Sequence, residues 1–406
     1  MKNFKVFDGN ISSPIGFLAS GVHCGIKEKN KDLSIIYSEC PSVCSAVFTK
    51  NKVIAAPLVI SKKHIEDKYA QVIVVNSGNA NACTGEQGMK DAELMVELTS
   101  KKLLIPKENV IVSSTGIIGV PMPMDKVKIG IEDGVKALSK KGGLDAAQAI
   151  LTTDKNMKNI GVELEIDGQK ITIGAMAKGS RMIHPNMATM LSFLTTDAKV
   201  EPIFFQNLLQ EVTGLTYNMI SVDGDTSTND MVVCMANGLA SNKEIGYDHP
   251  QKDKFIEAFK FVHEYLAKSI VQDGEGSSKF IEVKVIKSQT EEDAKLAVKS
   301  ILNSNLVKTS LFGEQSNWGR ILCSIGYCSA DIDINSIDIS IGANNAIVKM
   351  FSKGKALDYS KTEASEILKN KDLKIIVNLN SGDKEAVGWG CDLSYDYVKI
   401  NSAPIA

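Results

Sequence analysis

The sequence predicts a layered α/β protein in which helices and strands alternate from one end of the chain to the other. Short apolar runs and runs of alternating apolar and polar residues recur, which is typical of strands. Between them, apolar residues recur at the helical spacing of about 3.6 residues. The chain has 406 residues, of which 44% are hydrophobic. That length exceeds one ordinary domain of about 100–200 residues and favours two packed units.

The first half of the chain shows both kinds of pattern. The Asp167-Gly168 dipeptide between two alternating runs is typical of a β-hairpin turn. The elements expected in this half are a strand at Gln71–Val75, a helix at Met89–Leu104, a strand at Val110–Val112, and hairpin strands at Val162–Ile166 and Ile171–Ile173.

The second half continues the alternation. Pro202 stands where a helix can begin, and Ile203–Val212 follows with helical periodicity. The lysine-rich stretch Ser241–Lys254 is expected to be an exposed connection. Further helices are expected at Phe255–Val271 and Glu291–Leu302, and strands at Phe280–Ile286, Ile332–Ile341, Ala346–Met350 and Ile375–Leu379.

Composition and charge exclude several classes of protein. Lys and Arg number 46 and Asp and Glu 48, which gives a net charge of −2 and argues against nucleic-acid binding by a basic surface. No signal-peptide core and no apolar run of about 20 residues is seen, so we expect a cytoplasmic protein without a membrane segment. The eight cysteines are scattered, and no His–Cys cluster predicts a metal site.

The usual catalytic motifs are also missing. The sequence contains no phosphate-binding loop of the Gly-x-x-x-x-Gly-Lys type, no Gly-x-Gly-x-x-Gly and no Gly-x-Ser-x-Gly. The five histidines give no positive sign of a Ser-His-Asp triad. An enzyme with this sequence therefore needs another source for its nucleophile and its base.

Three segments carry small and polar residues where chemistry is commonly placed. Gly174–Asp197 contains Thr189 directly after Ala188, Asn76–Gly85 follows a strand, and Ser113–Gly119 forms a second expected turn after a strand. Loops at strand ends often hold reacting groups. Each segment, taken singly, also fits a tight turn or a buried strand.

Taken together, these segments and four others resemble the ornithine acetyltransferase family, also called glutamate N-acetyltransferases, which act in arginine biosynthesis. The resemblance covers nearly the whole chain. Its motifs are Asn76–Gly85, Ser114–Gly119, Thr152–Asp154, Lys178–Asp197, Asp223–Asp230 (interpreted here as a turn), Gly274–Gly276 with Lys279-Phe280, and Asn317–Ile321.

The resemblance implies a fold and a processing event. The fold would be an αββα-type sandwich with a smaller C-terminal part from about residue 285. The chain would cut itself between Ala188 and Thr189, giving an α chain of residues 1–188 and a β chain of residues 189–406. These chains would stay interleaved and pair into an (αβ)2 heterotetramer.

The resemblance also implies a mechanism. Thr189 would be the nucleophile, and after cleavage its own α-amine could act as the base, which accounts for the missing histidine. It would take acetyl from N2-acetylornithine and pass it to glutamate, while Thr115 and Gly116 form the oxyanion hole. No cofactor is implied, and the use of acetyl-CoA as a second donor, an amino-acid N-acetyltransferase activity, stays open.

The substrate contacts implied by the resemblance are Thr152, Lys178, Thr189, Glu275, Asn401 and Ala406. This chain departs from the family at two of the positions near the site. Arg181 stands where typical members have Gly, and Ala406 ends the chain where they have a Thr whose hydroxyl helps bind substrate. These two differences bear on the choice of substrates and not on self-cleavage or acyl transfer.

Two other functions stay open on the sequence alone. An amidase or aminopeptidase on the same scaffold would pass its acyl group to water instead of glutamate. A non-catalytic paralogue would bind an amino acid and remain uncut. Transfer without net acetate release separates the first alternative from an acetyltransferase.

Overall fold

The computed structural model describes residues 3–184 and 190–402, and the chain divides into two compact units. Unit 1 comprises Met1–Gly179, Asn186–Tyr217 and Thr226–Leu266. Unit 2 comprises Ser180–Pro185, Asn218–Asp225 and Ala267–Ala406. The stretch 241–254, expected to be an exposed connection, lies inside unit 1; half of its residues are exposed, and a helix begins at Lys252.

Unit 1 is built on one mixed sheet that, within the described residues, has nine strands. Their order is β1-β6-β7-β8-β10-β3-β4-β5, and β2 pairs with β3. The strands are β1 (Phe4–Phe7), β2 (Phe17–Val22), β3 (Leu33–Phe48), β4 (Tyr69–Asn79), β5 (Val110–Ile117), β6 (Lys158–Ile166), β7 (Gln169–Lys178), β8 (Leu191–Thr196) and β10 (Met231–Ala236). The helices are α1 (Ala56–His64), α2 (Gly85–Leu103), α3 (Met124–Lys136), α4 (Gly143–Ala149), α5 (Pro202–Leu215) and α6 (Lys252–Gln272).

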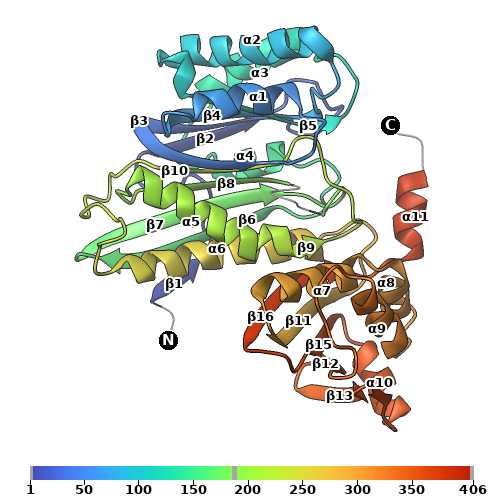
Figure 1. Ribbon diagram of the computed structural model, residues 1–406. Coiled ribbons are helices and arrows are strands. Elements are labelled where there is room, and N and C mark those ends of the chain that lie inside the picture. Colours follow the sequence, from blue (N-terminus) through green and yellow to red (C-terminus); the bar gives the residue numbers. More distant parts are fainter. Residues whose placement is uncertain (1–2, 185–189, 403–406) are drawn as a thin grey trace. The chain divides into compact units, whose positions relative to one another are not determined.

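The long strand β3 joins two layers of this sheet, because it pairs with β2 and β4 in one layer and with β10 in the other (Figure 1). Alternation along β4 shows how the layers pack. Ile73 and Val75 belong to an apolar cluster that also contains Phe193 of β8, whereas Val72 and Val74 belong to a second cluster on the opposite face. The first cluster therefore fills the space between the two layers.

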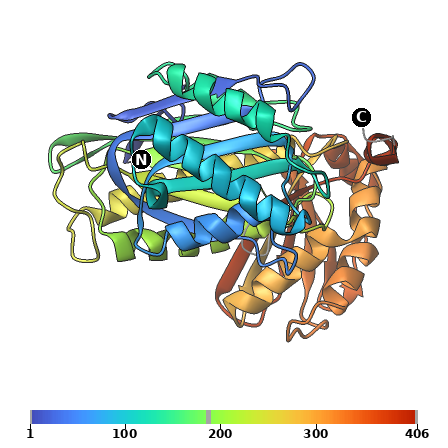
Figure 2. The ribbon, with the colours of Figure 1, turned by 90° about the horizontal axis from the view of Figure 1, so that it is seen from above.

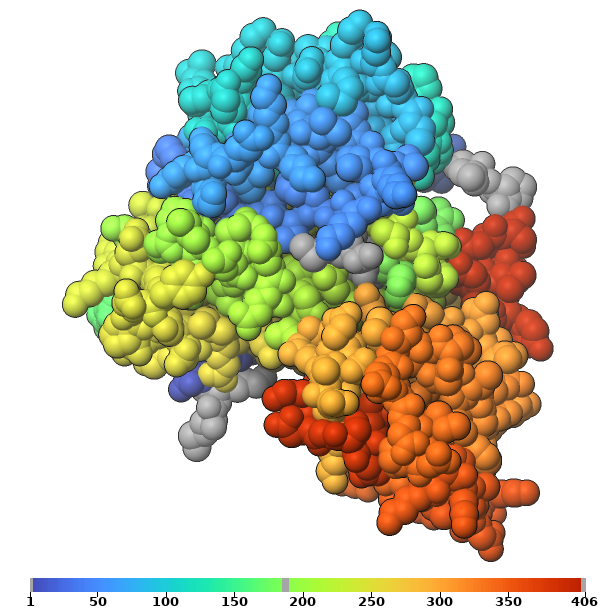
Figure 3. Space-filling model, in the orientation of Figure 1, coloured from blue at the N-terminus to red at the C-terminus, as the bar shows by residue number. Residues whose placement is uncertain are grey.

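Helices cover both outer faces of unit 1. Helices α1, α2 and α3 pack over β3, β4 and β5, and Figure 2 shows them lying across these strands. Their outer surfaces form much of the blue and cyan surface in Figure 3, so the apolar cluster beneath them is covered. On the other face, Phe205 of α5 packs against Phe255 and Phe259 of α6. The expected αββα arrangement is confirmed in this unit.

Local signals in the sequence produced most of these elements. The hairpin of β6 and β7 turns at Asp167 and Gly168, whose φ angles are +54° and +72°, as a tight turn of this kind requires. Helix α5 begins at Pro202, and the carboxylate of Glu201 accepts hydrogen bonds from the backbone N–H groups of Ile203 and Phe204.

Two local predictions were wrong. The expected strand Ile332–Ile341 begins only at Asp338, because the polar residues before it form a turn in which the Ser336 backbone N–H donates to the Asp333 carbonyl. The small residues after Val112 do not form a turn, because β5 continues to Ile117 and pairs with β4 throughout.

Unit 2 contains a second mixed sheet, of seven strands within the described residues, in the order β14-β13-β12-β15-β11-β16-β9. The strands are β9 (Ile220–Ser221), β11 (Phe280–Ser288), β12 (Asp338–Ala343), β13 (Ala346–Ser352), β14 (Lys355–Ala356), β15 (Asp372–Asn378) and β16 (Lys384–Cys391). The helices are α7 (Glu291–Asn303), α8 (Asn305–Phe312), α9 (Trp318–Gly326), α10 (Lys361–Leu368) and α11 (Tyr395–Ser402).

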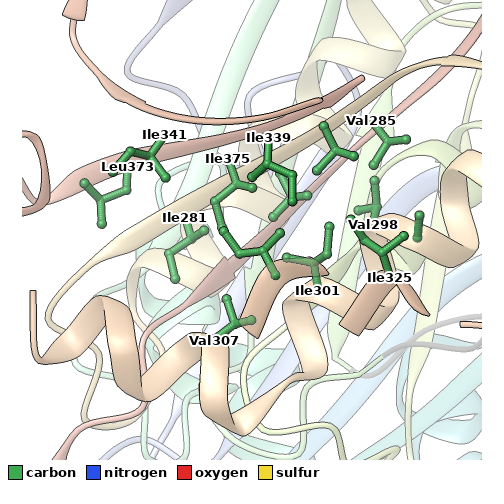
Figure 4. Close-up of a cluster of buried hydrophobic side chains, with 14 of the residues drawn as sticks. Ile281, Val285, Val298, Ile301, Val307, Ile325, Ile339, Ile341, Leu373 and Ile375 are labelled. Carbon is green, nitrogen blue, oxygen red and sulfur yellow. The ribbon is translucent and has the colours of Figure 1, made fainter. Parts of the chain in front are cut away.

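The core of unit 2 lies between this sheet and its helices. Alternate residues of β11, Ile281 and Val285 among them, point toward Val298 and Ile301 of α7 (Figure 4). Helix α7 is held at its start by Thr290, whose hydroxyl accepts a hydrogen bond from the Asp293 backbone N–H. Unit 2 therefore has a hydrophobic core of its own.

Candidate active site

Three of the expected site residues, Ala188, Thr189 and Ala406, lie outside the described residues. The others fall into two groups. Thr115, Gly116, Thr152 and Lys178 belong to unit 1, and Glu275 and Asn401 belong to unit 2.

Thr115 and Gly116 lie near the end of β5, paired with Ser77 and Gly78 of the parallel strand β4. A side chain is excluded at position 116, because a Cβ atom there would stand 2.3 Å from the carbonyl carbon of Gly78. The φ angle of Gly116 is +139°, which also favours glycine. Gly116 is exposed, and its strand β5 lies at the edge of the sheet.

Asn229 holds the strand end that carries Thr115. Its Nδ2 donates to the backbone carbonyls of Ala80 at 2.6 Å and Ser114 at 2.9 Å. Its Oδ1 accepts a hydrogen bond from the Thr228 hydroxyl at 2.5 Å, which orients the amide. Sequence reasoning interpreted Asp223–Asp230 only as a turn and missed this contact. An amide two residues before the apolar run of β10 is the signal that could have indicated it.

Lys178, at the end of β7, connects Thr152 with Thr115. Its Nζ donates to Thr152 Oγ1 at 2.7 Å and lies 3.5 Å from Thr115 Oγ1. Its side chain is only 10% exposed. A buried ammonium that touches two hydroxyl groups is well placed to bind an anionic group such as a carboxylate.

Asp154 balances the charge of Lys178 and was not assigned a role from the sequence. Its buried carboxylate accepts a hydrogen bond from Lys158 Nζ at 2.7 Å and lies 3.9 Å from Lys178 Nζ. Burial alone would raise the pKa of Asp154, but Lys178, Lys158 and the Gly179 backbone N–H outweigh it and hold the pKa at about 2. Asp154 is therefore ionised at neutral pH.

A further lysine approaches this group from the N-terminal part of unit 1. Lys27 Nζ donates to the carbonyl of Leu151 at 2.6 Å, next to Thr152. Burial lowers the pKa of Lys27 to about 8, opposed by the nearby Asp32 and assisted by the charge of Lys178. Lys27 and Lys178 therefore both lie close to Thr152, whose backbone N–H donates to the ionised carboxylate of Asp154 at 3.1 Å.

Asp230 is a buried residue directly before β10, the strand that pairs in parallel with β8. Burial raises its pKa well above the usual range, although Ser227 and Lys178 oppose the shift. Its Oδ2 has no hydrogen-bond partner within the described part of the chain. The Met231 backbone N–H donates to the carbonyl of Met190, the residue that follows Thr189 in sequence. Asp230 therefore lies beside the start of β8.

In unit 2, Glu275, Asn401 and Arg181 contact one another. Asn401 Nδ2 donates to Glu275 Oε2 at 3.0 Å, and Arg181 Nη1 donates to Asn401 Oδ1 at 3.3 Å. Arg181 Nε lies 3.8 Å from Glu275 Oε1. Gly276 allows this arrangement, because a Cβ atom at that position would stand 2.3 Å from the Tyr397 backbone nitrogen of α11. The group therefore brings two expected substrate contacts together with Arg181.

The chain on either side of Arg181 is anchored within unit 2. The carboxylate of Asp223 accepts hydrogen bonds from the backbone N–H groups of Met182 and Ile183, both at 2.8 Å. The Glu275 backbone N–H donates to the Ser180 carbonyl at 2.9 Å. Arg181 is thus held beside Glu275 by contacts on both of its flanks.

Within residues 3–184 and 190–402, no three His, Cys, Asp or Glu side chains are arranged to hold a metal ion. Over the same residues, no helix has the length and apolar character needed to cross a membrane.

The comparisons with known proteins agree over almost the full chain. The ArgJ family model matches residues 18–403. An arginine biosynthesis bifunctional protein ArgJ from Caldanaerobacter subterraneus is 51% identical over 98% of this chain and 99% of its own length. A homologue with the same description from Clostridium acetobutylicum is 48% identical over 99% of both chains.

Solved structures of similar sequence include an arginine biosynthesis bifunctional protein ArgJ from Bacillus halodurans. It is 41% identical with a TM-score of 0.44, and the match covers 46% of this chain and 98% of that one. An ornithine acetyltransferase from Mycobacterium tuberculosis, complexed with ornithine, is 35% identical with a TM-score of 0.43, covering 46% of this chain and 100% of that one. On the family match and the two full-length relatives, the chain belongs to the ArgJ family of arginine biosynthesis enzymes.

Proposed function

We propose that the chain is a self-processing acetyltransferase that moves acetyl from N2-acetylornithine to glutamate through an acetyl ester on Thr189. The observation that carries this proposal is the group formed by Thr115, Thr152 and Lys178, in which a buried cation touches two hydroxyl groups beside an exposed glycine backbone. These are residue types that a carboxylate-bearing substrate and a tetrahedral oxyanion require.

Processing comes first. The Thr189 hydroxyl attacks the Ala188 carbonyl, and the bond between the Ala188 carbonyl carbon and the Thr189 nitrogen breaks as that nitrogen takes up the proton. The resulting ester is opened by water, which leaves Ala188 with a carboxylate and Thr189 with a free α-amine. This amine has an ordinary pKa of about 8, so it can accept the hydroxyl proton near neutral pH.

Acetyl transfer then follows in two half-reactions. Thr189 Oγ attacks the acetyl carbonyl of the donor, ornithine leaves with a proton on its α-nitrogen, and an acetyl ester remains. The α-amine of glutamate attacks that ester and regenerates the Thr189 hydroxyl. In both steps Thr115 and Gly116 stabilise the oxyanion, and losing one such donor costs about 100- to 1000-fold in rate.

Lys178 supplies the charge that recognises the α-carboxylate common to N2-acetylornithine and glutamate. Asp154 supports this role because its carboxylate remains ionised at neutral pH and holds the ammonium of Lys178 in place. The substrate carboxylate would also accept a hydrogen bond from Thr152, which Lys178 already orients. Lys178 therefore contributes to binding more than to bond breaking.

The relatives are named bifunctional proteins, which motivates a second activity. We propose that acetyl-CoA also acetylates Thr189, so that the chain has amino-acid N-acetyltransferase activity and needs no resident cofactor. A cytoplasmic (αβ)2 heterotetramer is the assembly proposed for the processed enzyme.

Denaturing mass measurement tests the processing step. The 43.9 kDa chain should give fragments 1–188 and 189–406, which correspond to about 20 and 24 kDa when the mass is divided in proportion to length. Thr189→Ala should stay uncut, and Thr189→Ser, which keeps a hydroxyl, should still be cut. A cleaved Thr189→Ala variant would remove Thr189 as the nucleophile.

The acyl acceptor is tested separately. Purified protein with N2-acetylornithine and glutamate should form ornithine and N-acetylglutamate in equal amounts, with little acetate. Acetate equal to ornithine, with no N-acetylglutamate, would instead identify a hydrolase of the amidase type. An uncut chain without an acetyl-enzyme would identify a binding protein.

A further inference from the structure

Glu275 is a buried carboxylate with one oxygen free of hydrogen bonds. Its side chain is 3% exposed, and Oε2 is bound by Asn401. Oε1 is also buried and has no hydrogen-bond partner among the described residues. The Arg181 guanidinium nitrogen at 3.8 Å faces Oε1 as an ion pair, beyond hydrogen-bond distance. Because burying an unsatisfied carboxylate oxygen is costly, this position suits a ligand that brings a hydrogen-bond donor with positive charge.

Arg181 presents the opposite charge at the same place. Its side chain is 43% exposed, so the guanidinium can reach a ligand as well as Glu275. Arginine stays protonated at all pH values relevant to the enzyme and binds carboxylates through two parallel hydrogen bonds. Asn401 connects the two charges, because it donates to Glu275 and accepts from Arg181.

We infer that Arg181 and Glu275 form a subsite with two charges that recognises the side-chain ends of both substrates in turn. This inference rests on the proposed function. The donor N2-acetylornithine ends in an ammonium group, and the acceptor glutamate ends in a carboxylate. Glu275 binds the ammonium during the first half-reaction, and Arg181 binds the carboxylate during the second. Arg181 is thereby a specificity-determining residue for the acceptor.

The two charges also interact with each other, which makes the prediction directional. While the donor is bound, Arg181 competes with its ammonium for Glu275 and repels it. While glutamate is bound, Arg181 attracts its γ-carboxylate, and Glu275 repels it. Removing the positive charge should therefore weaken glutamate and should not weaken N2-acetylornithine. A residue that only supported the local structure would affect both substrates in the same direction.

Steady-state kinetics of Arg181→Gln tests the inference, because in a two-step transfer kcat/KM for each substrate reports its own half-reaction. We expect kcat/KM for glutamate to fall about tenfold, the usual size for the loss of one charged hydrogen bond. We expect kcat/KM for N2-acetylornithine to be unchanged or higher. Arg181→Lys keeps the charge and should recover part of the loss for glutamate. Arg320→Gln removes the other arginine of the chain and serves as the matched control.

Direct binding gives a second readout that does not need turnover. Calorimetric titration of Arg181→Gln should show weaker glutamate binding and equal or tighter ornithine binding, and Glu275→Gln should show the reverse. Equal shifts for both ligands, or no shift in either, would overturn the subsite. The proposed function alone would be overturned by a different result. In that case the wild type binds both ligands and the variants shift binding as expected, but the wild type transfers no acetyl.

Discussion

Replacing Asp154 by Asn should destabilise unit 1 by an amount that can be worked out from its pKa. The carboxylate is 0% exposed and lies 2.7 Å from Lys158 Nζ and 3.9 Å from Lys178 Nζ. Its pKa is about 2 in the folded protein and 3.8 ordinarily. At about 1.4 kcal/mol per pKa unit, the ionised form contributes about 2 kcal/mol at neutral pH. Asn is uncharged, so the variant should lose about this much.

The pH dependence gives the sharper test. Because the folded-state pKa is below the unfolded value, the stabilisation is complete above about pH 5 and is lost as the pH falls from about 4 to about 2. Urea unfolding of wild type and Asp154→Asn, followed at several pH values, should therefore show a difference that shrinks only in this acidic range.

A matched control is Asp133→Asn, which removes a carboxylate that is 54% exposed and 3.4 Å from the exposed Lys136. The free energy of unfolding of this variant should differ from that of wild type by no more than about 0.5 kcal/mol, as for other surface ion pairs. The reasoning would be refuted if both variants unfolded with the same free energy, or if the Asp154→Asn difference stayed constant down to pH 2.

Three further substitutions test the geometry around β5. Gly116→Ala should lower stability by about 1–3 kcal/mol and reduce transfer, because its Cβ would stand 2.3 Å from the Gly78 carbonyl carbon; a melting temperature equal to wild type would contradict the close approach. Asn229→Asp removes both hydrogens donated to Ala80 and Ser114, so kcat should fall about tenfold or more. The conservative variant Asn229→Gln should recover little of this loss in kcat. An unchanged kcat would show that Asn229 does not position the strand end. Lys178→Met should lower kcat/KM for both substrates at least tenfold, because both carry an α-carboxylate, and an effect on only one of them would contradict a shared carboxylate site.

Local chemistry made much of the fold predictable. The Asp167-Gly168 turn and the start of α5 at Pro202 depend on residues adjacent in sequence, and both are confirmed. The continuation of β5 through Ser113–Ile117 could not be predicted from residues adjacent in sequence. Small and polar residues usually leave a strand, but here they stay in it because β4 offers an equally small partner, Gly78, at the same level. This close fit depends on β4 and β5 together, so neither segment alone predicts it.

The candidate site shows the same division. Thr115, Thr152 and Lys178 were expected from the resemblance, and the structure places the ammonium of Lys178 in contact with both threonines. The importance of Asp154 and Asn229 depends on contacts with residues up to 149 positions away, as in the bond from Asn229 to Ala80. The neighbouring sequence supplies Lys158 as one partner of Asp154, but it does not specify the distant partners Gly179 and Ala80. The direction of Arg181 was left open by the sequence, and its contacts with Asn401 and Glu275 now give it one.

The position of β8 has a consequence for how the protein matures. This strand pairs with β7 on one side and with β10 on the other, and the proposed cut falls between β7 and β8. After a cut before Thr189, the two product chains would contribute neighbouring strands, β7 and β8, to one sheet. Backbone hydrogen bonds between these strands would join the two chains.

Such products behave as a split protein, whose halves separate only when the sheet itself unfolds. Folding of the uncut chain closes the β7–β8 pair within one molecule, whereas reassembly of separated halves is bimolecular and slows as the protein is diluted. If the chain is cut as proposed, folding has to precede the cut, and the cut enzyme could not readily be rebuilt from its denatured parts.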